Sequence, residues 1–308
     1  MSRKIPTLTG LIDAKQLGVI YIHEHVLTNP PPSRMRIDPD YKLDDSDKIV
    51  EELMLFHSYG GNTLVDCTAI DYGRDVAAMR EVAKRVPVNL LAITGFNRGD
   101  YEEWVATGEV KQFAEMMMKD IEEGMDGTDV KAALIKIGTS YNHILPAEYK
   151  IIEAAGIAYR NTGTPIITHT TLGTMGIEQV KALEKAGVDP NNIALSHLDQ
   201  NLDFYYLSEI ARTGAYIEFD GPSKVKYAPD SARIEMLKRL CDAGFEDRIL
   251  ISGDMGRRSY LTAYGGGPGF GFLLGKFVPR LLAEGFTQET VDKFFNTNPA
   301  RFLSGEVR

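Results

Sequence analysis

Histidine and aspartate residues at recurring positions are the part of this sequence that could do chemistry. His23 and His25 close the run GVIYIHEH, and side chains two apart in a strand point to one face, so both imidazoles can reach one metal ion. His169 closes the run TPIITHT, His197 lies in NIALSHL, and Asp254 closes RILISGD. Four of the six histidines thus share one type of position, which predicts a metal site with imidazole and carboxylate ligands.

The other two histidines lack this placement. His57 in LMLFHSYG and His143 in SYNHIL are expected to be a surface helix residue and a loop residue.

A lysine near the end of another apolar run is the unusual member of the set. Lys136 in ALIKIGTS lies between Ile135 and Ile137, which predicts that it faces the interior. A buried ammonium without a partner is costly, and an ammonium beside metal cations is repelled. Lys136 must therefore pair with a carboxylate, lose its proton or be chemically converted.

The elements that must position these residues alternate along the chain. Eight β-branched runs are separated by segments with apolar residues at three- and four-residue spacing, which predicts a parallel sheet covered by helices. Eight repeats predict a (β/α)₈ TIM barrel with the metal site at its C-terminal mouth. A doubly wound sheet is the alternative, but no G-x-G-x-x-G follows a strand. The length suits a single domain over residues 1–308.

Two connections are longer than the rest, and long βα loops usually carry function. They are TNPPPSRMRIDPDYKLDD after the first strand and MGRRSYLTAYGGGPGFG after the eighth. The loops after strands seven and eight carry cations and a tyrosine, where this fold often binds phosphate. Such a cluster predicts an anchor for a phosphorylated substrate, with a solvated surface as the alternative. Its members are Lys224, Lys226, Arg257, Arg258 and Tyr260.

Composition limits the partners and the compartment. The formal net charge of −9 disfavours nucleic acid and anionic membranes, which both demand a basic face. No apolar leader segment and no run of about 18 apolar residues is present, so we expect a cytoplasmic protein. The two cysteines allow neither a disulfide framework nor a thiolate zinc cluster.

Several segments resemble one known family in the same order along the chain. TLTGLIDAKQLGVIYIHEHV resembles the amino-terminal signature of the phosphotriesterase family of the amidohydrolase superfamily. ALIKIGTS, PIITHT, LSHLDQN and ILISGDM resemble its later strand ends. The DGxxK and DMxRxSY patterns resemble the branch of the family that hydrolyses phosphorylated sugar lactones.

The resemblance implies a cofactor of two divalent metal ions, with zinc favoured and manganese, cobalt or nickel as alternatives. Lys136 would be converted to N6-carboxylysine, an anionic ligand that bridges both ions. The buried ion would take His23, His25 and Asp254, and the solvent-facing ion would take His169 and His197.

The implied activity is that of a lactonase. A hydroxide held between the metals would attack the carbonyl of a pentono-1,4-lactone 5-phosphate or a similar ring, and Asp254 would pass its proton to the leaving oxygen. The implied phosphate contacts are Lys224, Arg257 and Tyr260. Lys226 and Arg258 are further candidates, because the register within each loop is open, and Asn97 and Arg98 could contact the ring.

Other functions fit parts of the pattern. A phosphotriesterase, a carboxylesterase or another lactonase of the family would use the same ligands. A relative that acts on a cyclic amide or deaminates a base would not need the phosphate cluster. A metal-containing barrel with a binding role is the alternative outside enzymes. The expected partner is a small anionic sugar lactone, and the resemblance implies a homodimer.

Overall fold

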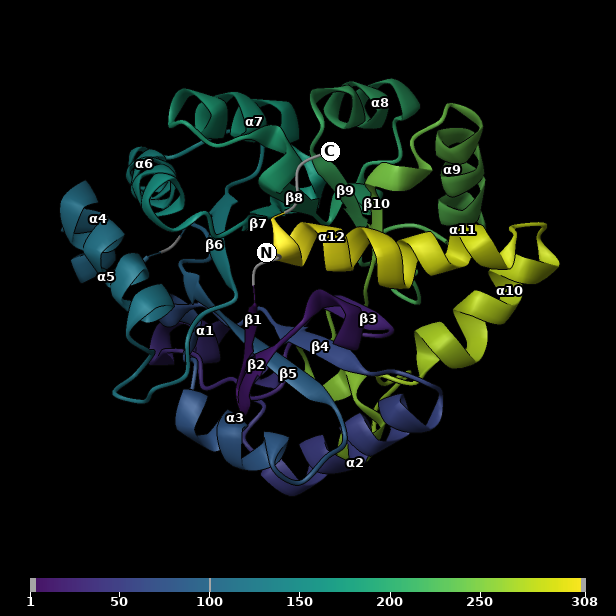
Figure 1. Cartoon of the computed structure of the whole chain (residues 1–308), viewed down its shortest axis with the longest axis horizontal. Coiled ribbons are helices and arrows are strands. Elements are labelled where there is room, and N and C mark those ends of the chain that lie inside the picture. The colour runs from purple at the N-terminus through teal and green to yellow at the C-terminus, as the bar shows by residue number, and fades with distance from the viewer. Residues whose placement is uncertain (1–3, 100, 306–308) are drawn as a thin grey trace.

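The computed structural model describes residues 4–99 and 101–305 of the chain. Within these residues, eight parallel strands form one sheet that curves into a nearly closed barrel (Figure 1). Each strand pairs with the next one along the chain, so the predicted (β/α)₈ barrel is confirmed. The strands are β3 (Ile20–Glu24), β4 (Thr63–Asp66), β5 (Asn89–Gly95), β6 (Leu134–Thr139), β7 (Ile166–Thr170), β8 (Ile193–Ser196), β9 (Tyr216–Phe219) and β10 (Ile249–Ile251).

Helices surround the barrel because each has one apolar face to bury (Figure 1). In α5, Phe113 and Met117 are buried on the face that packs against the barrel, while Lys111 and Glu115 are exposed. The helices are α1 (Pro32–Ile37), α2 (Ser46–Ser58), α3 (Val76–Ala83), α4 (Glu103–Thr107), α5 (Val110–Glu122), α6 (Pro146–Thr162), α7 (Gly176–Lys185), α8 (Phe204–Thr213), α9 (Asp230–Asp242), α10 (Val278–Ala283), α11 (Gln288–Asp292) and α12 (Asn298–Ser304).

A separate apolar cluster fills the barrel interior. It contains alternate residues of the strands, such as Ile20 and Ile22 of β3 and Leu134 of β6. The same cluster includes Phe302 of α12 and Ile5 of a hairpin, β1 (Ile5–Thr7) with β2 (Gly10–Ile12). Figure 1 shows α12 lying across this end of the barrel. The sequence did not predict the hairpin, whose strands are only three residues long.

Side chains close the seam between β10 and β3. The Ser252 hydroxyl accepts a hydrogen bond from the His23 backbone N–H at 2.9 Å. The buried Glu24 carboxylate accepts from the backbone N–H groups of Gly253 and Met255, both at 2.8 Å. Burial raises the pKa of Glu24 to about 8, although these two hydrogen bonds oppose the rise. Glu24 thus fixes the strand end that carries Asp254.

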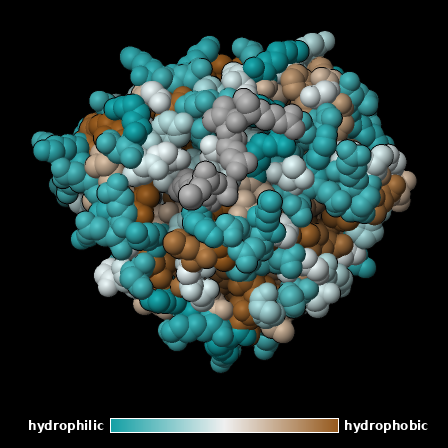
Figure 2. Space-filling view, in the orientation of Figure 1, coloured by the Kyte–Doolittle hydropathy of each residue, from teal (hydrophilic) through white to brown (hydrophobic). Residues whose placement is uncertain are grey.

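The face of the molecule seen in Figure 2 is mostly polar. Figure 2 shows hydrophilic side chains over most of one face, with small hydrophobic areas between them. None of the helices in the described ranges is long and apolar enough to cross a bilayer. Cys67 is buried, Cys241 is half-buried, and both are free thiols.

Candidate active site

A bulge in β3 brings the first two histidines into the barrel mouth. Tyr21 pairs with Leu64 and Glu24 pairs with Asp66, so β3 carries one extra residue between these pairs. Without that residue, the alternation from Ile20 and Ile22 would turn Glu24 inward and His23 outward. The extra residue reverses the alternation and points His23 toward the mouth.

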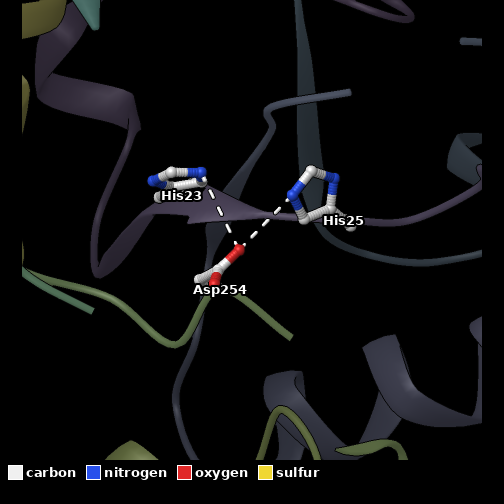
Figure 3. A group of neighbouring side chains, drawn as sticks. All are labelled: His23, His25 and Asp254. Atoms are coloured by element: carbon white, nitrogen blue, oxygen red, sulfur yellow. Dashed lines mark ion pairs between the residues drawn. The ribbon is translucent and has the colours of Figure 1, made fainter. Parts of the chain in front are cut away.

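His23, His25 and Asp254 form a compact group (Figure 3). Their ligand atoms all lie within 4.8 Å of one another. The Asp254 Oδ1 atom is 3.4 Å from His25 Nε2 and 3.9 Å from His23 Nε2. On the far side of each ring, His25 Nδ1 lies 2.9 Å from the Thr68 hydroxyl and His23 Nδ1 lies 3.3 Å from Glu218. These contacts fix the rings and leave each Nε2 directed at the shared space.

His197 and His169 lie beside this group. The His197 Nδ1 atom is 2.9 Å from Asp220 Oδ1, and the other Asp220 oxygen is 3.4 Å from His23 Nδ1. The rings of His169 and His197 have centroids 4.4 Å apart. His169 Nε2 accepts a hydrogen bond from Arg98 Nε at 3.0 Å. Three further strand ends therefore add an imidazole or a carboxylate to the same space.

Lys136 lies at the base of the mouth, as the sequence predicted. Its side chain is buried, and its Nζ atom is 3.1 Å from His23 Nε2. Among the described residues, it forms no ion pair with a carboxylate. Gly95 packs against it from β5 with φ +97°, and a Cβ there would lie 2.2 Å from the Lys136 carbonyl oxygen. The glycine permits this close approach of the two strands.

The electrostatics differ between the members of the group. Burial and Lys136 would lower the pKa of His23, but the neighbouring carboxylates of Glu218 and Asp220 raise it to about 9. Burial, together with the neighbouring His197 and Arg98, holds the pKa of His169 well below its ordinary value. Burial alone would raise the pKa of Asp254, but Lys224 and the hydrogen bond from His25 hold it well below its ordinary value. Neutral imidazole and ionised carboxylate are the forms that bind a metal ion.

This donor set fits a divalent metal ion. Imidazole nitrogens and carboxylate oxygens suit zinc and its first-row neighbours, and their spacing allows shared coordination. His23, His197 and Asp220 form a second group whose ligand atoms lie within 4.8 Å of one another. Asp220 was not predicted, and neither was Glu218. The signal was the acidic pair in AYIEFD, because carboxylates two apart in a buried strand share the inner face.

A cavity of about 230 Å³ opens above the group. Its walls include the predicted phosphate residues Lys224, Arg257 and Tyr260. Lys224 is buried and its Nζ donates to Asp254 Oδ2 at 2.7 Å. Arg257 pairs with Asp38.

The neighbouring cations do not line this cavity. Lys226 is exposed, with its Nζ 4.8 Å from the ring centroid of Tyr227. Arg258 donates to the Lys42 carbonyl oxygen at 2.6 Å and pairs with Asp44. Of the two pairs that the sequence left open, Lys224 and Arg257 are thus the members that line the cavity.

On the opposite side of the barrel, the end of β5 also reaches the cavity. Asn97 and Arg98, the two residues that the sequence analysis named as possible contacts to a substrate ring, line it. Arg34, Tyr41 and Tyr72 line it as well and were not predicted. Only the length of the first βα loop pointed to Arg34 and Tyr41. His57 lies on α2 and His143 in an exposed loop, both away from the site, as expected.

The fold and the site define a hydrolase built on a (β/α)₈ barrel. A model of the phosphotriesterase family matches residues 3–303, and the chain belongs to this family. The "phosphotriesterase homology protein" of Escherichia coli (strain K12) is 37% identical over 93% of this chain and 98% of its own. A crystal structure of an E. coli protein of that name, with phosphate in its active site, is 36% identical, has a TM-score of 0.90 and covers 94% of this chain and 99% of that one.

Two other relatives carry lactonase names. A "phospho-furanose lactonase" of Mycoplasmopsis synoviae (strain 53) is 35% identical over 97% of this chain and 91% of its own. The crystal structure of a lactonase from Listeria monocytogenes has a TM-score of 0.94 and 38% identity, and it covers 99% of this chain and 100% of that one.

Proposed function

We propose that this protein is a metal-dependent lactonase that opens phosphorylated sugar lactones of the pentono-1,4-lactone 5-phosphate type. The observation that carries the proposal is that one cavity is lined both by possible metal ligands and by residues that could bind a phosphate group. His23, His25 and Asp254 form a group at its base that could hold a metal ion, and Lys224, Arg257 and Tyr260 line its side. The names of the Mycoplasmopsis and Listeria relatives, and the phosphate in the E. coli site, support the same substrate class.

The metal ligands would divide between two ions. His23, His25 and Asp254 would hold one, and His169 and His197 would hold the other. Lys136, carboxylated on Nζ, would supply an anionic ligand, which would remove the cost of a buried ammonium among cations. When bound, such ions supply an ionised water at neutral pH and a Lewis acid for the substrate carbonyl. Zinc is the expected metal.

The chain's own residues would then bind the substrate and move the proton. Arg257 and Tyr260 would bind the phosphate through N–H and O–H donors. Lys224 contacts both Asp254 and the ring of Tyr260, with its Nζ 5.5 Å from the ring centroid, so it connects the phosphate end to the reacting end. Asp254 would accept the proton of the attacking water and return it to the leaving ring oxygen.

The test is to incubate the zinc- or manganese-loaded protein with a panel of pentono-1,4-lactone 5-phosphates. Proton release reports ring opening, and phosphorus NMR reports whether the phosphate stays attached. The proposal predicts a phosphorylated sugar acid as the product and loss of turnover after chelation. Release of inorganic phosphate, or preferred hydrolysis of esters or phosphotriesters, would favour the other activities of the family. Retained metal without turnover of any substrate would favour a binding role.

A further inference from the structure

Acidic side chains of the long loop after β3 (residues 25–45) hold the loop after β10 (residues 254–270). The backbone N–H of Ser259 donates to Asp40 Oδ1 at 2.9 Å, and its hydroxyl donates to the other oxygen. Three successive residues of the second loop each contact a carboxylate of the first loop, and Arg257 also lies within 3.7 Å of a second carboxylate, that of Asp40. The pairs are Asp38 with Arg257, Asp44 with Arg258, and Asp40 with Ser259.

These partners send two adjacent arginines in different directions. Arg257 pairs with Asp38 through Nη1 and donates to the Tyr41 hydroxyl through Nη2 at 2.6 Å. Its guanidinium carbon also lies 4.1 Å from the centroid of the Tyr41 ring. Arg258 bonds instead to Asp44 and to the Lys42 carbonyl oxygen. Only the first of the two arginines lines the cavity.

Asp38 contacts Arg257 from outside the cavity. It is not among the described residues that line the cavity, and its side chain is 29% exposed. Burial alone would raise the pKa of Asp38, but hydrogen bonds from Arg257 and from the Asp40 backbone hold it below its ordinary value. The carboxylate is therefore charged at neutral pH. Asp38 accepts from Nη1 outside the cavity and Tyr41 accepts from Nη2, so the remaining N–H groups of the Arg257 guanidinium are the ones that could bind an anion.

We propose that Asp38 is a positioning residue that fixes the Arg257 guanidinium for an anionic substrate group and so sets the specificity of the site. The inference rests on the proposed function, which gives Arg257 the phosphate. Asp38 has two opposing effects on a bound anion: its charge repels the anion, and its hydrogen bond removes the cost of ordering a long side chain. We expect the positioning effect to be larger than the repulsion, because the contacts with Tyr41 and Asp38 together hold the Arg257 guanidinium in one orientation.

Whether Asp38→Asn weakens or strengthens the binding of an anion therefore tests the proposal. Asp44→Asn is a matched control, because it removes the same charge from the same loop and breaks the other arginine pair. Inorganic phosphate serves as the probe, through its inhibition constant with an unphosphorylated lactone as substrate. We expect D38N to raise this constant, and the KM of a phosphorylated lactone, about tenfold. We expect kcat and the turnover of unphosphorylated lactone to stay unchanged, and D44N to resemble the wild type.

A D38N inhibition constant that is lower than or equal to that of D44N overturns the proposal. If D38N does not fold, Asp38→Glu replaces it, because it keeps the charge and displaces the guanidinium. We expect D38E to raise the inhibition constant a few-fold, and an unchanged value overturns the proposal. A wild-type protein that neither binds phosphate nor prefers phosphorylated lactones instead overturns the proposed function. The two failures are therefore distinguishable.

Discussion

The Nζ atom of Lys136 lies 3.1 Å from Nε2 of His23, at the base of a cavity whose walls carry further basic side chains. Throughout the described ranges no carboxylate pairs with this lysine, although burying an unpaired charge is costly. A lysine converted to a carbamate, the form that we propose for Lys136, would instead be an anionic ligand for cations.

Lys136→Met should therefore abolish stoichiometric metal binding, whereas Lys136→Glu, which keeps an anionic oxygen, should retain more metal. We expect at least a hundredfold loss of turnover in K136M, on the order of the effect of losing one strong contact at a reacting centre. Metal content by mass spectrometry, together with carbon dioxide released on acidification, provides the readout. Full metal content in K136M would contradict the role of Lys136.

Adjacent arginines should behave differently. Arg257→Ala should raise the KM for a phosphorylated lactone about 10- to 100-fold, since hydrogen bonds to charged groups contribute about 1.5–3 kcal/mol. Arg258→Ala should change it less than about twofold, because that side chain bonds to Asp44 and Lys42 outside the cavity. Steady-state kinetics with both variants decides the matter, and equal effects would mean that the loop rearranges around substrate.

A fully buried ion pair supports the site from behind. The Arg233 Nε atom of α9 donates to Asp199 Oδ2 at 2.5 Å, and neither side chain is exposed. Arg233→Met should lower the free energy of unfolding by about 3–5 kcal/mol, because it leaves a buried carboxylate without its partner. Urea unfolding measures the loss. The double variant with Asp199→Asn should recover part of the lost stability. No recovery would mean that the loss comes from other contacts of Arg233.

Asp71 should make stability depend on pH. Burial raises its pKa to about 6, although the Asn97 backbone N–H and Arg34 oppose the rise. The pKa of Asp71 is therefore higher in the folded chain than in the unfolded chain. Its contribution to the free energy of unfolding is fully present below the unfolded pKa and is lost as the pH rises through about 6. Asp71→Asn should therefore gain stability relative to wild type at higher pH. We expect the free energy of unfolding of D71N to exceed that of the wild type by about 1–2 kcal/mol more at about pH 7.5 than at about pH 5. A gap that does not change with pH would contradict the assignment.

The alternation of strands and helices was enough to predict the barrel and the convergence of its polar strand ends. It did so because buried parallel strands are short apolar runs, and their C-terminal ends share one mouth. The bulge in β3 was not predictable, because a plain two-residue period gives the same pattern of letters. The left-handed backbone at His197 (φ 63°) and Asp254 (φ 44°) leaves no sequence signal either, since neither residue is glycine.

Contacts between distant loops were also beyond the sequence. The length of the loop that contains RIDPDYKLDD suggested a function, but no pattern predicted partners for its acidic residues, because Arg257 and Arg258 lie more than two hundred residues away. Which arginine faces the cavity depends on these partners, so the register stayed open until the loops were placed in space. The homodimer, the cytoplasmic location and the identity of the metal stay predictions.

The most direct test of the account compares one pentono-1,4-lactone with and without its 5-phosphate, using the metal-loaded protein. The account predicts that kcat/KM is at least about a hundredfold higher with the phosphate, equivalent to about 3 kcal/mol of binding at the anchor. Equal values, or preference for the unphosphorylated ring, would contradict it. The metal-dependent hydrolase would then stand, but Lys224, Arg257 and Tyr260 would be no more than a polar rim.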